Sequence, residues 1–85
     1  MQGYTSDTGR TFVLGAPSRA AAQIHAALMA GFRAGLARLT PGTPLAEVHR
    51  AATRAIRAQG FDRYARGHFG HGLGTGPGSE EWPFI

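Results

Sequence analysis

With 85 residues, the chain can form one small domain or part of a larger one, and its lack of cysteine excludes disulfides, thiolate zinc sites and cysteine nucleophiles. The net charge of +4 comes from nine scattered arginines. Arg50, Arg54 and Arg57 share one predicted helix face without aromatic neighbours, which indicates a solvated surface rather than a nucleic-acid site. No apolar run approaches the roughly 20 residues that cross a bilayer, and no signal-peptide pattern opens the chain, so we expect a cytoplasmic protein without membrane contact.

Residues 4–14 form the first predicted element. They are rich in β-branched and aromatic side chains and run into a Gly-Ala-Pro turn, a combination that predicts a β-strand. Because alternate residues of a strand share one face, Asp7 lies on the same side as Thr5 and Gly9. The Asp7 carboxylate therefore has small neighbours and room beside it for a bound group.

A long helix is predicted over residues 19–39, with Ser18 as its N-cap. Its large apolar residues follow the 3.6-residue period and predict one buried stripe, made of Ile24, Leu28, Phe32, Gly35, Leu36 and Leu39. Gly31 and Gly35, four residues apart, predict that another element approaches this helix closely.

A second helix follows the Thr-Pro-Gly turn at residues 40–42. We expect Thr43 to cap it, Pro44 to occupy its first position and Gly60 to end it in the left-handed conformation. Its predicted buried stripe is Leu45, Val48, Ala52, Ala55 and Ile56. The short turn predicts two antiparallel helices that pack through Leu28, Phe32 and Leu36 of the first and Val48, Ala52 and Ile56 of the second.

After Phe61 the chain is very rich in glycine and is expected to be irregular or short-stranded. The alternating glycines at positions 72–78 do not indicate a phosphate loop, because no Lys-Ser/Thr pair and no helix pattern follow them. This region contains His71, and aspartate and histidine are ligands that a divalent metal ion prefers. His25 and His49 lie on the predicted helices and are interpreted as partly exposed surface residues.

The order of these elements and several short motifs resemble metallopeptidase family M24, which includes the methionine aminopeptidases, Xaa-Pro aminopeptidases, prolidases and creatinase. The residues that carry the resemblance are Gly3-Tyr4-x-Ser6-Asp7-x-x-Arg10-Thr11-Phe12, Leu39-x-Pro41-Gly42, Gly60, Gly70-His71-Gly72-Leu73-Gly74 and Glu81-x-Pro83. The resemblance runs through essentially the whole chain and fits the proline-cleaving branch best. It implies an α+β class and the so-called pita-bread fold, of which residues 1–85 would form a strand–helix–helix–strand part, truncated at both ends.

The resemblance also implies a metal site with two divalent ions, Mn, Co, Zn or Fe, held by two aspartates, one histidine and two glutamates. By motif, Asp7 would be the second aspartate and a bridging ligand, and His71 the histidine ligand. The first aspartate would precede Met1, and both glutamates would follow Ile85. We therefore expect a longer parent enzyme, a homodimer acting on Xaa-Pro peptides, and no bound metal or aminopeptidase activity in the 85-residue chain alone.

Two positions depart from the Xaa-Pro pattern. Glu80 stands, one residue late, where a histidine that stabilises the tetrahedral intermediate is expected, and His68 lies one position closer to His71 than the usual upstream histidine. An ionised glutamate cannot donate a hydrogen bond, so Glu80 and His68 are secondary candidates for catalysis. A lyase or amidinohydrolase on the same fold and a non-catalytic remnant both remain open. If the fold is preserved, the Asp7 carboxylate and the His71 imidazole should lie within roughly 4–7 Å of each other.

Overall fold

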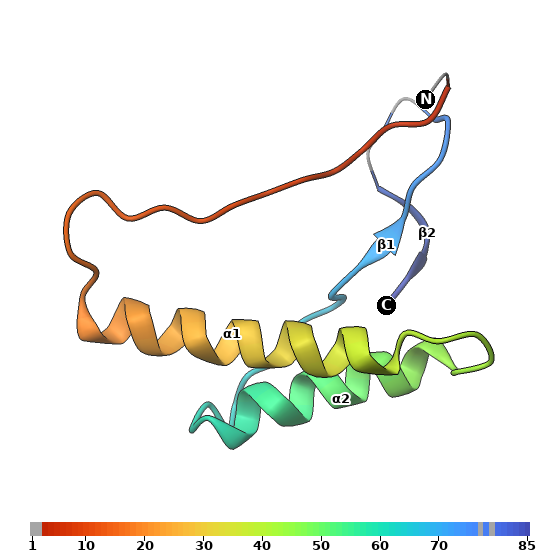
Figure 1. The fold of residues 1–85 in the computed structure, drawn as a ribbon. Coiled ribbons are helices and arrows are strands. Elements are labelled where there is room, and N and C mark those ends of the chain that lie inside the picture. The colour runs from red at the N-terminus through yellow and green to blue at the C-terminus, as the bar shows by residue number, and fades with distance from the viewer. Residues whose placement is uncertain (1–2, 77, 79) are drawn as a thin grey trace.

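A computed structural model describes residues 3–76, 78 and 80–85 of the chain. Its elements are two helices, α1 (Arg19–Arg38) and α2 (Leu45–Ala58), and two short antiparallel strands, β1 (His71–Gly72) and β2 (Glu81–Phe84) (Figure 1). The predicted α+β class is therefore confirmed. Within the described ranges no helix combines the length and the apolar character needed to cross a membrane.

The ends of α1 follow from local chemistry. The Ser18 hydroxyl accepts a hydrogen bond from the Ala21 N–H at 3.1 Å, which satisfies one of the free donors of the first turn and confirms Ser18 as the N-cap. At the other end the Leu39 N–H donates to the Leu36 carbonyl, so the helix stops one residue earlier than predicted.

The start of α2 differs from the prediction. Pro44 is the N-cap and makes no side-chain cap hydrogen bond, and the helix begins at Leu45. The Thr43 hydroxyl does not cap the helix, because it lies 2.9 Å from the Thr40 hydroxyl and pairs with it across the turn. The end is as expected, since Gly60 has a φ of +99° and its N–H donates to the Arg57 carbonyl.

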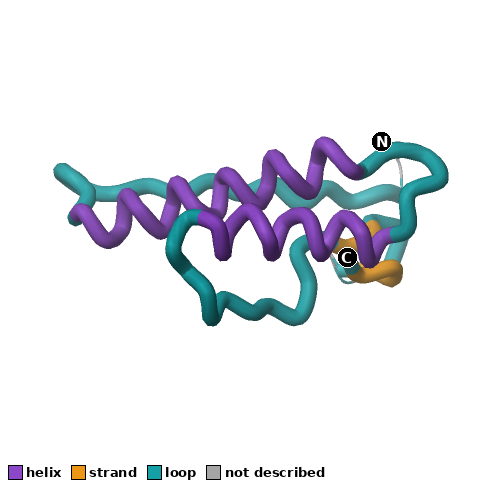
Figure 2. Tube along the Cα trace, turned by 90° about the horizontal axis from the view of Figure 1, so that it is seen from below, coloured by secondary structure: helices purple, strands orange, loops and turns teal. Residues whose placement is uncertain are grey.

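The two helices lie side by side and antiparallel, as predicted (Figures 1 and 2). The buried residues of α1 are small, namely Ala27, Gly31 and Gly35, and those of α2 are Val48, Ala51, Ala52 and Ile56. A Cβ atom on Gly31 would lie 2.5 Å from Ile56 Cγ1 and 3.1 Å from the Ala52 carbonyl oxygen. The predicted close approach at these glycines is therefore confirmed.

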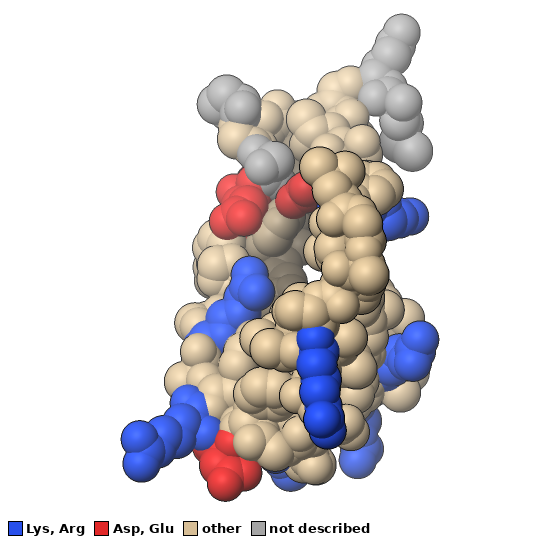
Figure 3. Space-filling view, turned by 90° about the vertical axis from the view of Figure 1, so that its left-hand side faces the viewer, with Lys and Arg blue, Asp and Glu red and all other residues tan. Residues whose placement is uncertain are grey.

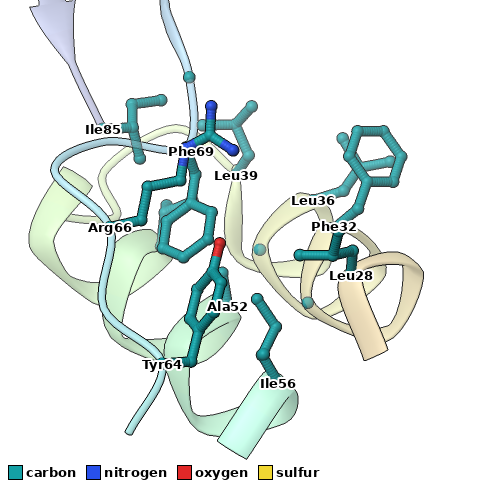
Figure 4. A pocket seen from close by; sticks show the side chains of 14 residues that line it. Leu28, Phe32, Leu36, Leu39, Ala52, Ile56, Tyr64, Arg66, Phe69 and Ile85 are labelled. Atoms are coloured by element: carbon teal, nitrogen blue, oxygen red, sulfur yellow. The ribbon is translucent and has the colours of Figure 1, made fainter. Parts of the chain in front are cut away.

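The prediction for the large residues of α1 was wrong. Leu28, Phe32 and Leu36 are not buried between the helices; their exposed fractions are 38%, 62% and 57%. The small side chains at positions 27, 31 and 35 allow a closer helix approach than leucine or phenylalanine would, so this neighbouring face makes the contact. The large residues instead form one wall of an open apolar groove of about 320 Å³, opposite Tyr64, Phe69 and Ile85 (Figure 4).

Residues 4–14 are extended but form no strand, so the predicted β-strand over these residues was wrong. Within the described residues their backbone makes one backbone hydrogen bond, from the Thr5 N–H to the Gly74 carbonyl at 3.3 Å. Phe12 is 86% and Leu14 fully exposed. A strand needs a neighbour for its backbone groups and a surface on which to bury one face, and the described residues supply neither. We call residues 4–14 the extended segment; it runs the length of α1, on the side where β1 and β2 lie (Figures 1 and 2).

The short strands hold the glycine-rich region in place. His71 pairs with Phe84 and Gly72 with Glu81, with an irregularity between the two pairs, and the Ile85 N–H donates to the Gly70 carbonyl at 2.8 Å. The Glu81 carboxylate turns into the loop that follows β1, where it accepts the Gly76 N–H at 2.8 Å.

Candidate metal site

The fold brings Asp7 and His71 together although 64 positions separate them in the chain. Asp7 belongs to the extended segment and His71 begins β1; His71 Nε2 lies 3.0 Å from Asp7 Oδ2. The hydrogen bond from Thr5 to Gly74 fixes the segment beside the loop that follows His71. The predicted proximity is confirmed. The distance is shorter than expected because a hydrogen bond joins the two groups directly.

The orientation of the His71 ring follows from its second nitrogen. Nδ1 lies 2.9 Å from the Gly72 carbonyl oxygen, which can only accept, so Nδ1 carries a proton. The hydrogen bond to Asp7 therefore exists when the ring is charged and Nε2 donates to the carboxylate. In the neutral ring the Nε2 lone pair would face a carboxylate oxygen, and a cation between the two groups would relieve this repulsion. A histidine that ligates a metal through one nitrogen has the same arrangement, with its other N–H held by a carbonyl or carboxylate.

The same contacts shift the protonation of His71. The Gly72 carbonyl raises the pKa of His71 above its ordinary value, burial opposes this, and the carboxylates of Glu80 and Asp7 raise it further. The His71 side chain is 16% exposed and that of Asp7 46%. The site is therefore a half-open one, at which a proton and a metal ion would compete for His71 Nε2.

The two secondary candidates also lie at this site. Glu80 Oε1 is 3.9 Å from His71 Nε2, and Glu80 Oε2 is 3.8 Å from His68 Nε2, so the carboxylate reaches both imidazoles. Asp7 and Glu80 lie beside His71, and Glu81 pairs with the next residue, Gly72. Three of the five acidic residues of a cationic chain thus belong to this region. Figure 3 shows two acidic groups close together near the upper end of one face, whereas the basic groups, with a further acidic group among them, are spread over the rest of it. This local negative charge favours a bound cation.

The donor set fits a borderline divalent ion but provides only part of a site. Imidazole nitrogen and carboxylate oxygen suit Mn, Co, Zn and Fe. Over residues 3–76, 78 and 80–85, however, no three His, Asp or Glu side chains converge closely enough to hold an ion. The roles of Asp7 and His71 as ligands stay predictions, and a complete site needs donors in addition to this pair.

Two residues that position the site were not identified from the sequence. Glu81 lies in the space that a Cβ atom on Gly74 or Gly76 would fill, so these glycines accommodate its carboxylate. His49 is partly exposed on α2, as predicted, and in addition its Nε2 is 3.2 Å from the Arg66 carbonyl oxygen and its ring centroid is 4.9 Å from that of Phe69. It thereby ties the segment before His71 to α2. The alternating glycines could have indicated that a side chain such as that of Glu81 packs against this loop. The sequence of α2, in contrast, contains no local pattern that would predict the contacts of His49 with Arg66 and Phe69.

Comparison with known proteins identifies the family of the chain. The sequence profile of metallopeptidase family M24 matches residues 1–85. An uncharacterized peptidase of Staphylococcus aureus strain USA300 is 32% identical over 71 residues, and one of the bovine strain RF122 is 31% identical over 71 residues. Each match covers 84% of this chain and 20% of the relative, so the chain spans about one fifth of the length of these relatives. No solved structure matches it with significance. The chain belongs to metallopeptidase family M24.

Proposed function

We propose that this chain is part of the catalytic domain, with the pita-bread fold, of a metal-dependent peptidase that cleaves Xaa-Pro bonds through a dinuclear centre. Asp7 and His71 are ligands of that centre. The observation that carries this proposal is the 3.0 Å contact between Asp7 Oδ2 and His71 Nε2, with His71 Nδ1 held by the Gly72 carbonyl. A surface ion pair would not require the second contact, whereas a metal ligand does.

The residues of this chain would act by holding and orienting. Gly72 keeps the proton on His71 Nδ1, so that Nε2 is available as a ligand, and Asp7 contributes the negative charge that offsets a divalent ion. When bound, the ions polarise the scissile carbonyl and lower the pKa of a water molecule. Glu80 accepts rather than donates while ionised, so it adds negative charge near His68 and His71 and does not stabilise a developing oxyanion.

The position of Glu80 favours a second candidate, a lyase or amidinohydrolase of the same fold. Peptide hydrolysis in the Xaa-Pro branch is expected to need a hydrogen-bond donor where Glu80 lies, and a carboxylate suits a cationic amidino group better. The exchange experiment described below separates the two candidates.

The ligand roles can be tested on the 85-residue chain by titration with Mn²⁺, which broadens the NMR signals of nearby nuclei. A partial site holds no ion stably, but at high Mn²⁺ concentrations weak, transient contact is sufficient for broadening. We expect this broadening at His71 at lower Mn²⁺ concentrations than at His25, which is exposed on α1 and serves as the internal control. Asp7→Asn should weaken the effect at His71 and leave His25 unchanged. Equal broadening of the two histidines would contradict the assignment.

The activity can be tested by exchange of the matching segment into the relative from strain USA300. The chimera is assayed with an Xaa-Pro dipeptide, a dipeptide without proline and creatine, and Asp7→Asn is the control. Hydrolysis of the Xaa-Pro substrate that the control lacks supports the peptidase, and turnover of creatine alone supports the second candidate. A chimera that is folded, binds Mn²⁺ and prefers the dipeptide without proline would refute the Xaa-Pro assignment. Light scattering of the chimera tests the proposed homodimer.

A further inference from the structure

Asp7 and His71 are connected to the two helices by separate parts of the chain. Asp7 belongs to the extended segment, which leads into the N-terminus of α1, whereas His71 follows the loop of residues 59–70 that leaves the C-terminus of α2. Within the described residues, no Cα atom of β1 or β2 lies within 8 Å of a Cα atom of α1 or α2 (Figure 1). The position of His71 relative to the helices therefore depends on how the loop of residues 59–70 is held.

This loop has little regular structure of its own. Residues 59–70 contain no helix or strand, and the connection is longer than the typical loop of about 4–6 residues. Beyond the loop, β1 and β2 pair over only a few residues, and an isolated two-stranded sheet is marginally stable in water. Contacts between the loop and the helices are therefore needed to fix the position of His71.

Two side chains of α2 hold the loop at two of its carbonyl groups. Arg57 donates to the Tyr64 carbonyl oxygen from Nε at 3.1 Å and from Nη2 at 2.9 Å. His49 lies earlier on the same helix, with Nε2 3.2 Å from the Arg66 carbonyl oxygen, which can only accept, so Nε2 donates. The contact of Arg57 is the stronger of the two, because its guanidinium is charged and donates twice. We call these contacts of Arg57 and His49 the α2 clamp.

Aromatic contacts and a backbone hydrogen bond connect the α2 clamp to the start of β1. The ring centroid of Phe69 lies 4.9 Å from that of His49 and 6.1 Å from that of Tyr64 (Figure 4). The Phe69 N–H donates to the carbonyl of Ile85, directly after β2. Phe69 is two residues before His71, so the clamp restrains the chain almost as far as the candidate ligand.

We propose that Arg57 and His49 are positioning residues for the candidate metal site. By holding the loop of residues 59–70 on α2, they keep His71 Nε2 where the Asp7 carboxylate reaches it, at 3.0 Å. This inference rests on the proposed function, in which Asp7 and His71 are metal ligands. It assigns to α2 a part in metal binding, because an ion can use both ligands only while the loop is held.

The first test measures amide hydrogen exchange in the complete 85-residue chain without metal. Arg57→Met removes the donors and keeps a long side chain, and Arg54→Met, at an exposed arginine one turn earlier on α2, is the matched control. We expect exchange at Phe69 and Gly70 to become about tenfold faster in Arg57→Met and to stay unchanged in Arg54→Met. His49→Leu should also speed this exchange, and His49→Gln, which keeps an N–H donor, should restore it in part. The amides of α1 should exchange as before, whereas a general loss of stability would speed them too.

The second test is titration with Mn²⁺. Arg57→Met should need about tenfold more Mn²⁺ than the unmodified chain to broaden the signals of His71, with His25 as the internal reference, and Arg54→Met should not. Circular dichroism checks that each variant keeps its helices, and His49→Leu replaces Arg57→Met if that variant unfolds.

The outcomes separate this proposal from the proposed function. Equal broadening of His71 and His25 in the unmodified chain would contradict the ligand roles themselves, and the positioning role with them. A preference for His71 that Arg57→Met retains in full would contradict the positioning role alone, even if exchange at Phe69 becomes faster. Unchanged exchange in the variants of both Arg57 and His49 would show that the α2 clamp does not hold the loop and would also overturn the proposal.

Discussion

The contact between α1 and α2 can be tested by adding one methyl group at either of two glycines. In Gly31→Ala the new Cβ would lie 2.5 Å from Ile56 Cγ1 and 2.6 Å from Ile56 Cδ1. In Gly35→Ala the nearest atom is Ala52 Cβ at 3.5 Å, an ordinary contact distance. Both variants gain about 1 kcal/mol of helix propensity. They differ only in whether the methyl group has room.

The balance between the gain in helix propensity and the cost of overpacking decides whether each variant raises or lowers the free energy of unfolding. Overpacking a filled contact costs about 1–3 kcal/mol, and Ile56 cannot move away freely because it is 2% exposed and the Ala52 carbonyl is also close. We therefore expect Gly31→Ala to lower the free energy of unfolding by about 1 kcal/mol and Gly35→Ala to raise it by about the same amount. For a chain of this size each change shifts the melting temperature by about 4–8 °C.

The assay is thermal and urea unfolding followed by far-UV circular dichroism. A double-mutant cycle with Ile56→Ala identifies the clash. In the Ile56→Ala background Gly31→Ala should become stabilising by about 1 kcal/mol, because only its helix propensity remains, whereas the effect of Gly35→Ala should not change sign. If Gly31→Ala is as stable as Gly35→Ala, the helices do not approach as closely at Gly31 as the structure shows.

Three further predictions concern the cap, the site and its supporting loop. Ser18→Ala should destabilise α1 by about 1 kcal/mol and Ser18→Asp should not, as measured by thermal unfolding. Because the fold raises the pKa of His71, its charged form should stabilise the chain below the ordinary value of about 6.5, and this stabilisation should disappear as the pH rises through the raised pKa. An NMR titration of His71 with and without Asp7→Asn measures this shift, which should be smaller in the variant. Glu81→Ala should speed amide exchange at Gly76, whereas Glu81→Gln, which keeps an acceptor oxygen, should change it less.

The features that depend only on residues close together in the sequence were predicted correctly from local patterns. The Ser18 cap, the left-handed Gly60 and the presence of two helices each follow from residues within one or two turns, and the structure has them all. The face of α1 that packs on α2 could not be predicted in this way. Two adjacent stripes are apolar, and only the distance at which α2 approaches selects the small residues over Leu28 and Phe32.

The remaining features depend on contacts distant in the sequence. The composition of residues 4–14 favours a strand, but a strand exists only where another one pairs with it, and composition does not show whether one is present. The approach of Asp7 to His71 was predicted from the resemblance to a family and not from spacing, because no local pattern relates positions 64 apart. Which of the two ring nitrogens of His71 contacts the Gly72 carbonyl can be seen only in the structure.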